Sequence, residues 1–381
     1  MFPFLLKKLL QITHSKNPST YFHLLPNTYP KSLFSSSTPT STPSPTLSFL
    51  INSCGLTQES ALSVVKKAPL KTIEKADLVL SFFRAHGFSE THISTLITRR
   101  PKLLLSNVDK TLKPKFQFIL GLGLPCCHIA RLITSHPYIL SRSLKKQIIP
   151  ACHQFKRLVG SDENVLRVIK TTLWVLTCDS QRRILSNVSI LMKHKVPHPR
   201  IVKLVVGNPR ALKGKSLRFS GIVKAVEGMG FDPSRWAFVK AVLAFTVMSK
   251  SGWERKMEVY RSLGWSDSEI LAAFKKQPMC MISTEKKIRK GMDYFMNEMG
   301  MTPSVISQCP NIILHSLEKR VIPRHFVRQV LTSRNLVSEN YSISSIMIMS
   351  EKNFLDRFVT KYEEQVPELL MDYRSRMQLA R

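Results

Sequence analysis

The chain has 381 residues, of which 57 are Lys or Arg and 25 are Asp or Glu, so its formal net charge is +32 at pH 7. A hydrophobic content of 43% excludes a chain that is disordered throughout, because that much apolar surface can fill a core of ordinary size. Such an excess of cations favours a polyanionic partner, first nucleic acid and second an anionic membrane surface, over a basic surface that is merely solvated.

The first 47 residues are typical of an organelle transit peptide followed by a linker. No Asp or Glu precedes Glu59, residues 2–12 (FPFLLKKLLQI) can form a short apolar and basic helix, and residues 32–48 are mostly Ser, Thr and Pro. The basic residues there are all lysines. The short opening helix favours the mitochondrion, with the chloroplast as the alternative. No later stretch is long and apolar enough for us to expect a membrane span.

Short apolar segments that end in proline recur along the rest of the chain. Examples are ISTLITRRP and IARLITSHP, and two further segments fit the same register without the proline. The copies are 32 to 37 residues apart, and we number them one to eight by their end positions: Pro69, Pro101, Pro137, Leu173, Pro209, Thr246, Pro278 and Pro310. A recurring spacing of about this length is typical of repeat proteins.

Each copy predicts a helix, a turn and a second helix. The first helix carries one apolar stripe, as in Ile129, Leu132 and Ile133. Ser266 to Glu269 matches a capping box, and both Asp232-Pro233 and Thr302-Pro303 resemble an N-cap followed by a helix-starting proline.

The end proline stops the first helix, and the two or three apolar residues after it predict a tight turn that plugs the core. Glycines then predict left-handed ends for the second helices, at Gly87, Gly123, Gly160, Gly230, Gly264 and Gly300. A proline thirteen residues past the end position, at Pro114, Pro150 and Pro323, either starts the second helix or kinks it.

One helix pair cannot bury its own apolar stripe, so neighbouring pairs must stack. We therefore predict an all-α fold, an α-solenoid of about eight to nine helix–turn–helix repeats over residues 48–341 that forms a curved superhelix. Residues 342–381 contain the stretch KNFLDRFVTKYEEQVPELLMDY, which has more acids than bases. We expect them to form helices that cap the last repeat.

A cation recurs nine residues past the end position in seven of the eight copies, and only the first copy departs, with Leu78. We call these cations the ladder: Lys110, Lys146, Arg182, Arg218, Arg255, Lys287 and Lys319. Further cations stand beside them, at Lys145, Arg183, Lys256, Lys286 and Arg320. Equivalent positions of a solenoid fall on one line, so the ladder and Arg183, Lys256 and Arg320 are the predicted phosphate-binding residues. The alternative is that these side chains snorkel over neighbouring helices and serve the fold.

The sequence contains no pattern that points to catalysis, a metal or a cofactor. The seven cysteines include no Cys-x-x-Cys pair, and Cys126, Cys127 and His128 lack a second half at ligand spacing. Motifs for phosphate loops, dinucleotide binding, zinc proteases and serine hydrolases are missing. We expect no enzyme, no catalytic residue and no cofactor. The four tryptophans could stack on bases but are expected in the core; Trp174 directly follows the end position Leu173.

The repeat resembles that of the mitochondrial transcription termination factor (mTERF) family, in its plant organellar branch. The resemblance covers roughly residues 48–370 and rests on the proline-x-Leu/Ile-Leu/Ile stop, with LINSCGL at 50–56, RRPKLLL at 99–105, ERKMEVYRSLGWS at 254–266 and FLDRFVTKY at 354–362.

This resemblance implies an organellar protein that holds nucleic acid in a basic groove. It implies double-stranded DNA as the ligand and regulation or termination of transcription as the role. An RNA-binding role in intron splicing or RNA processing is the first alternative, and a protein-binding scaffold in organelle gene expression is the second. Organellar DNA or RNA and transcription or splicing proteins are the expected partners of a monomer.

Overall fold

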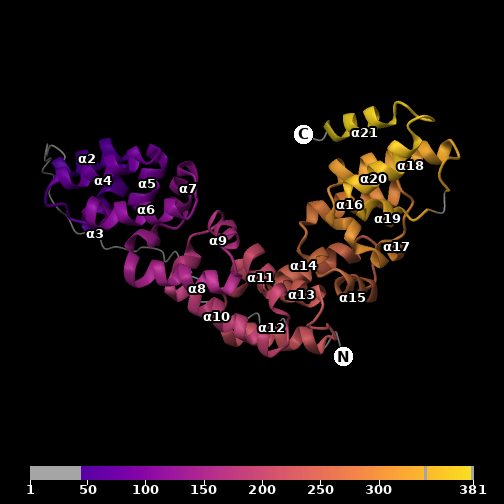
Figure 1. The fold of residues 1–381 in the computed structure, drawn as a ribbon, viewed down its shortest axis with the longest axis horizontal. Helices are drawn as coiled ribbons and strands as arrows, with labels where there is room; N and C mark the ends of the chain where they lie inside the picture. The colour runs from indigo at the N-terminus through magenta and orange to yellow at the C-terminus, as the bar shows by residue number, and fades with distance from the viewer. Residues whose placement is uncertain (1–43, 339–340, 379–381) are drawn as a thin grey trace, which may run out of the picture. The chain divides into compact units, whose positions relative to one another are not determined.

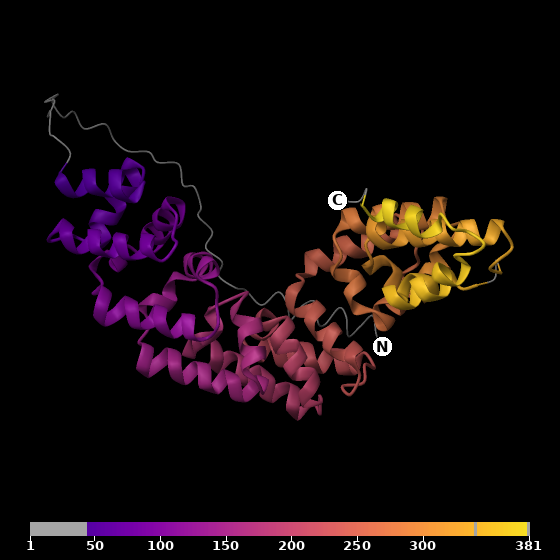
Figure 2. The same cartoon turned by 45° about the horizontal axis from the view of Figure 1, so that its top comes forward.

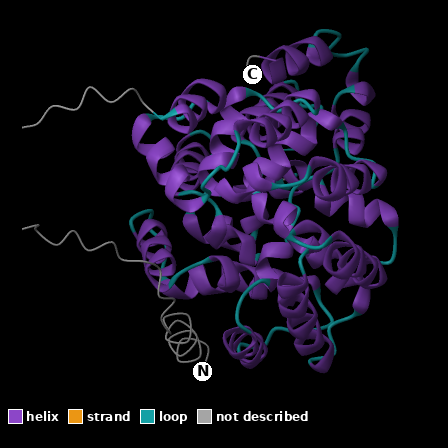
Figure 3. Cartoon of the chain, turned by 90° about the vertical axis from the view of Figure 1, so that its left-hand side faces the viewer, coloured by secondary structure: helices purple, strands orange, loops and turns teal. Residues whose placement is uncertain are grey.

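The computed structural model describes residues 44–338 and 341–378, and the predicted leader up to residue 43 lies outside them. Every regular element in this described part is a helix, which confirms the all-α prediction (Figure 3). None of its helices is sufficiently long and apolar to span a membrane. The chain divides into two compact units, which we call the N-terminal unit (residues 44–192 and 198–216) and the C-terminal unit (residues 193–197 and 217–378).

The N-terminal unit contains copies one to four and the beginning of copy five (Figure 1). Its elements are α2 (Pro45–Cys54), α3 (Gln58–Lys67), α4 (Ile73–Ala85), α5 (Glu90–Arg99), η1 (Pro101–Leu105), η2 (Val108–Leu112), α6 (Lys113–Gly121), α7 (Cys126–Ser135), η3 (Pro137–Ser141), η4 (Leu144–Ile148), α8 (Ile149–Val159), α9 (Asp162–Ile169), η5 (Trp174–Leu176), α10 (Cys178–Lys193), α11 (His198–Gly207) and η6 (Pro209–Leu212).

The C-terminal unit contains the rest of copy five, copies six to eight and the terminal helices. Its elements are α12 (Ser216–Gly228), α13 (Trp236–Val247), α14 (Lys250–Arg261), α15 (Asp267–Lys276), η7 (Pro278–Ile282), α16 (Glu285–Asn297), α17 (Pro303–Gln308), η8 (Pro310–Leu314), η9 (Leu317–Val321), α18 (Ile322–Ser333), α19 (Ile343–Ile348), α20 (Glu351–Phe358), η10 (Thr360–Tyr362) and α21 (Leu369–Gln378). The last helix, α21, packs along α18, and both can be followed in Figure 2.

The end proline determines how the first helix stops. After Pro101 the chain forms the 3₁₀ turn η1, which buries Leu103 and Leu104 as the sequence predicts. Copy four, which ends at Leu173, keeps only the shorter turn η5. In copy six, α13 runs through Thr246 to Val247, and Met248 and Ser249 lead directly into α14. In copy six the backbone N–H at the end position is available to continue the helix, whereas in copy four α9 already ends at Ile169, so the lack of proline does not by itself extend the helix.

The structure shows how the proline thirteen residues past the end position affects the second helix. Three α-helices have this proline as their second residue, and a π-helical turn precedes each of them. The prolines are Pro114, Pro150 and Pro323, and the turns before their helices are η2, η4 and η9 respectively. Since proline has no N–H, the turn closes through wider bonds, such as Lys113 N–H to the Val108 carbonyl. In the five copies without this proline the second helix is a single α-helix: α4, α10, α12, α14 and α16. The proline therefore inserts a π-helical turn at the start of the second helix.

The six predicted glycines all adopt positive φ angles, for example 86° at Gly123 and 83° at Gly160. Copies four and eight have no glycine at the equivalent place. There the left-handed residue is Lys195, with φ 59°, and Asn335, with φ 57°. A lysine in this conformation is uncommon, so the sequence pattern did not reveal it.

Two of the three predicted helix starts are confirmed. Ser266 and Glu269 form the capping box of α15, and Thr302 caps α17 ahead of Pro303. The prediction at Asp232-Pro233 is wrong. Asp232 accepts hydrogen bonds from the backbone N–H and hydroxyl of Ser234 within a turn, and α13 begins later, at Trp236. The Asp232 side chain satisfies this local turn rather than the helix end.

A second recurring contact joins copies two, four and six to the turn of the next copy, and copy eight to the end of α19. Fourteen residues past the end position, copies two, four, six and eight carry a polar donor, whereas the odd copies carry an apolar residue. Lys115 donates to the Leu140 carbonyl, Asn187 to Leu212, Tyr260 to Cys280, and Arg324 to Ile346 and Met349. We call these four residues the staples. They satisfy carbonyl groups that a short turn leaves without a helical partner.

Candidate nucleic-acid interface

Five ladder cations are the third residue of a second helix or of the π-helical turn that begins it, whereas Arg182 is the fifth residue of α10 and Arg255 the sixth residue of α14. In four of these five the cation's own N–H is capped by a side-chain oxygen three residues earlier. These N–H groups are 2.8 Å from Asn107 Oδ1, 3.2 Å from Ser143 Oγ, 3.3 Å from Thr284 Oγ1 and 3.2 Å from Ser316 Oγ, at Lys110, Lys146, Lys287 and Lys319 respectively.

This placement is unfavourable for the helices themselves. The N-terminus of an α-helix carries a partial positive charge, so a cation there costs about 0.3–1 kcal/mol where an acid would stabilise. Helix stability alone would therefore not select a cation at this offset. A cation at a helix start is instead suited to binding an anion such as phosphate.

In the N-terminal unit all three ladder side chains are exposed. Lys110 and Lys146 lie at the surface of η2 and η4, and Arg182 lies on α10 with its side chain 80% exposed. Arg182 is held by Asp179, whose other carboxylate oxygen is 3.1 Å from Arg142. One carboxylate therefore pairs with two arginines on this surface.

In the C-terminal unit the ladder divides into exposed and fold-bound members. Lys319 is exposed, and Arg255 is 72% exposed with Glu285 3.9 Å away. Lys287 is also exposed, but its Nζ donates to the Leu314 carbonyl at 2.5 Å. Arg218 is half-buried, donates to the Phe245 carbonyl at 3.5 Å, and has its pKa lowered by burial. Lys287 and Arg218 thus fit the alternative that a basic residue serves the fold.

The three predicted cations beside the ladder also divide into one exposed residue and two residues whose side chains are partly buried. Arg183 is exposed on α10. Lys256 is half-buried, and burial lowers the pKa of its ammonium group. Arg320 donates to the Met349 carbonyl at 2.8 Å, and burial lowers the pKa of its guanidinium. We therefore take as the exposed ladder the exposed ladder cations that are not bound to a backbone carbonyl: Lys110, Lys146, Arg182, Arg255 and Lys319.

The sequence reasoning missed the cations around the turn of copy three. Arg100 stacks over the Tyr138 ring, with 4.3 Å from its guanidinium carbon to the ring centroid, and also donates to Ser141 Oγ. The available signal was the aromatic residue directly after the end position, which occurs only as Tyr138 and Trp174. Within the described ranges no cluster of three His, Cys, Asp or Glu side chains is placed to hold a metal ion.

Comparison with known proteins gives two consistent results. The sequence profile of the mTERF family matches residues 80–245 and 237–355. The chain is 23% identical over 308 residues to "Transcription termination factor MTERF8, chloroplastic" of Arabidopsis thaliana, covering 79% of this chain and 59% of that protein. It is 18% identical over 298 residues to "Transcription termination factor MTERF15, mitochondrial" of the same plant, covering 76% and 57%. The chain thus spans less than two thirds of the length of either relative.

Proposed function

Because this chain belongs to the mTERF family, we propose that it binds double-stranded DNA through the exposed ladder and regulates or terminates transcription in an organelle. The observation that carries the proposal is the recurrence of a cation at one offset in seven of the eight copies, five times at the start of the second helix, where the helix dipole disfavours it. The names of the two relatives support a role in transcription.

Salt dependence of binding is the first test. Each phosphate neutralised on duplex DNA contributes a slope of about −0.9 to the plot of log affinity against log salt. All seven ladder cations would give a slope of about −6, and the five of the exposed ladder about −4 to −5. A flat response on duplex DNA and on RNA would refute the proposal.

A charge-reversal variant tests the ladder itself. Lys110→Glu, Lys146→Glu and Lys319→Glu together should weaken duplex binding similarly for all sequences and reduce the magnitude of the slope by about 3, since three phosphate contacts are lost. A matched control carries the same change of charge at exposed residues away from the ladder: Lys67→Glu, Lys352→Glu and Arg357→Glu. Equal losses in both triple variants would refute the assignment of these residues.

Parallel titrations with duplex DNA, structured RNA and single-stranded RNA separate the alternatives. Tightest binding to duplex DNA supports a role in transcription, whereas tightest binding to structured RNA favours splicing or RNA processing. A third result, specific capture of a transcription or ribosomal protein without salt-sensitive nucleic-acid binding, favours the scaffold.

For localisation we propose the mitochondrion, from the lysine-containing apolar helix predicted at residues 2–12. The relatives are named for both compartments, one chloroplastic and one mitochondrial. A fluorescent protein fused behind residues 1–47 and imaged in plant cells tests this directly; accumulation in chloroplasts would overturn it.

A further inference from the structure

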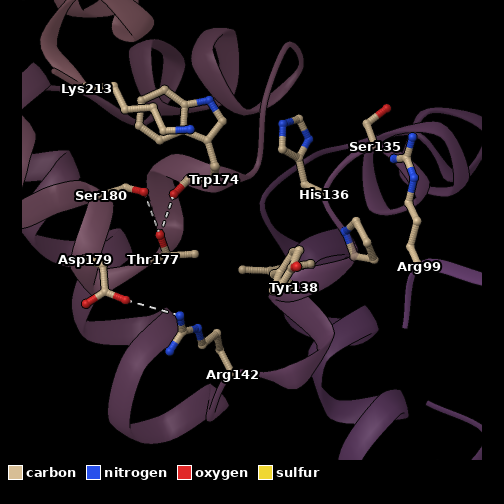
Figure 4. Close-up of a pocket in the computed structure, with 12 residues that line it drawn as sticks. Arg99, Ser135, His136, Tyr138, Arg142, Trp174, Thr177, Asp179, Ser180 and Lys213 are labelled. Atoms are coloured by element: carbon tan, nitrogen blue, oxygen red, sulfur yellow. Dashed lines mark hydrogen bonds and ion pairs between the residues drawn. The ribbon is translucent and has the colours of Figure 1, made fainter. Parts of the chain in front are cut away.

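A pocket of about 520 Å³ opens in the N-terminal unit where the turns of copies three and four meet (Figure 4). Its lining includes Arg99, His136, Tyr138, Arg142, Trp174 and Lys213. Pockets for small ligands usually span about 300–1,000 Å³ and combine apolar walls with a few polar groups. The pocket lies beside the ladder, because Asp179 in its wall pairs with both Arg142 and the ladder residue Arg182.

Three flat rings form its walls. Figure 4 shows Trp174, His136 and Tyr138 placed around one common space. Tyr138 is 59% exposed, whereas Trp174 is only 8% exposed, so one ring is accessible and the other is held firmly by the core. Arg100 covers one side of Tyr138, and Lys213 Nζ is 5.2 Å from the centroid of Trp174. Each of these two cations therefore lies against one of the rings.

His136 contributes an uncharged wall. Its Nε2 is 3.3 Å from Thr172 Oγ1, and burial, with the nearby charges of Arg210, Lys213 and Arg99, lowers the pKa of the imidazole below its usual value of 6.5. At neutral pH the ring is therefore neutral. The positive charge of the pocket comes from Arg99, Arg142 and Lys213.

We propose that this pocket binds one unpaired nucleotide, with the base against Tyr138 and Trp174 and the phosphate on Arg142 and Lys213. The combination of a flat apolar slot and flanking cations matches the two parts of a nucleotide, because aromatic side chains stack on any base and cations bind its phosphate. A base inside a duplex offers only its edges to a protein, so the ligand is an unpaired nucleotide.

Two sources of this ligand are consistent with the site. One is an unpaired nucleotide in a bound strand, which rests on the nucleic-acid binding proposed above. The other is a free nucleoside monophosphate, which does not. The arrangement is specific to this part of the chain, because the residue directly after the end position is aromatic only in copies three and four.

The test measures binding of a fluorescent single-stranded RNA, of the same strand with one abasic position, of a duplex, and of AMP and UMP as competitors. Tyr138→Ala is the main variant, since its exposed ring can be removed without opening the core. Tyr138→Phe is the matched control, because it keeps the ring and removes only the hydroxyl. Lys213→Ala tests the phosphate side.

For the strand source we expect Tyr138→Ala to weaken single-strand binding about tenfold, with Tyr138→Phe close to wild type and duplex affinity unchanged. The abasic strand should then bind the wild type more weakly and be insensitive to Tyr138→Ala. For the free source, AMP or UMP should bind the wild type, and both Tyr138→Ala and Lys213→Ala should abolish that binding.

Unchanged affinity of Tyr138→Ala and Lys213→Ala for the single strand, together with no binding of AMP or UMP, would overturn the pocket assignment even if duplex binding holds. Conversely, nucleotide binding that depends on Tyr138 in a protein without salt-sensitive duplex binding would keep the pocket and refute the proposed function.

Discussion

The second helices of copies two and eight place basic residues in two opposite environments only five residues apart. Lys110 and Lys319, at the helix start, are exposed ladder cations. Lys115 and Arg324, further along, are buried staples that are 5% and 0% exposed. Basic residues therefore face solvent at one offset and, at the other, bind carbonyl groups of the segment that packs next to them, η3 in copy two and α19 in copy eight.

This difference shows that the net charge of +32 overstates the charge available to a ligand. Burial lowers the pKa of the Lys115 ammonium group, so its surroundings disfavour the charge that the composition assigns to it. Arg324 is neutralised locally by Glu351, 2.8 Å away, and its guanidinium also stacks over Phe354. Such residues maintain the fold and cannot reach a phosphate.

The largest loss of stability should come from replacing Arg324, the buried staple of copy eight. Arg324→Ala removes the donor to the Ile346 carbonyl and one of the two donors to both the Met349 carbonyl and Glu351, and it empties the space of a fully buried side chain, which together should cost about 2–5 kcal/mol. Urea unfolding, followed by hydrogen exchange in the C-terminal unit, measures this loss. The control Lys319→Ala should stay within about 0.5 kcal/mol of wild type. Equal losses of stability in the two variants would contradict the contrast between buried staples and exposed ladder cations.

Copy two should show the same contrast on a smaller scale. Lys115→Met keeps most of the apolar stem but removes the donor to the Leu140 carbonyl, and an unsatisfied buried acceptor costs about 1–3 kcal/mol. Lys110→Met, on the exposed side of the same helical segment, should be nearly neutral. A Lys115→Met protein more stable than wild type in urea unfolding would show that burying the ammonium costs more than its hydrogen bond contributes.

The basic residues around Arg324, the staple of copy eight, also predict that the stability of the protein depends on pH. Burial, followed by the charges of Arg320, Arg324 and Lys287, lowers the pKa of His315 from 6.5 to about 4. Between these values the unfolded chain binds the proton and the folded protein does not, so stability falls as the pH is lowered through this window. The measurement is the free energy of unfolding at neutral pH and at about pH 5, which lies between the two pKa values of His315 given above. His315→Asn should show a shallower fall than wild type; parallel curves would exclude His315 as the cause.

The smallest effect is expected for the exposed ladder cation Arg182 and its ion pair. Asp179→Asn releases Arg142 and Arg182 from their shared carboxylate, and surface ion pairs of this kind contribute about 0.2–1 kcal/mol. We expect nucleic-acid affinity to rise about twofold to fivefold, because two cations become available and one repelling charge is lost. Asp162→Asn, which breaks the Lys156 pair away from the ladder, is the control. No gain over this control would show that Arg142 and Arg182 do not approach phosphate.

Most of the architecture could be predicted because its signals are local. The end proline acts on its own helix, and glycines such as Gly123 permit a backbone angle that other residues resist. Where these residues are missing, prediction fails: nothing in the pattern shows that copy six loses its turn at Thr246, or that Lys195 adopts the left-handed conformation.

The division of the basic residues could not be predicted, because it depends on contacts between copies. The sequence shows a cation at the same offset in Lys146 and Lys287, yet only Lys287 finds a carbonyl of the next turn within reach. The pocket escaped prediction for the same reason. Tyr138 and Trp174 are 36 residues apart in the chain and meet only when two turns stack.

The alternation of the staples has a consequence for how such a chain can grow or shrink. Lys115, Asn187, Tyr260 and Arg324 are separated by 72, 73 and 64 residues, so the pattern of internal hydrogen bonds repeats every second copy rather than every copy. Loss or duplication of a single copy would place two donors, or two apolar residues, in succession. A gene that gains or loses copies in pairs keeps each donor opposite its carbonyl, so the pair is the length that recombination can exchange without disturbing the interior.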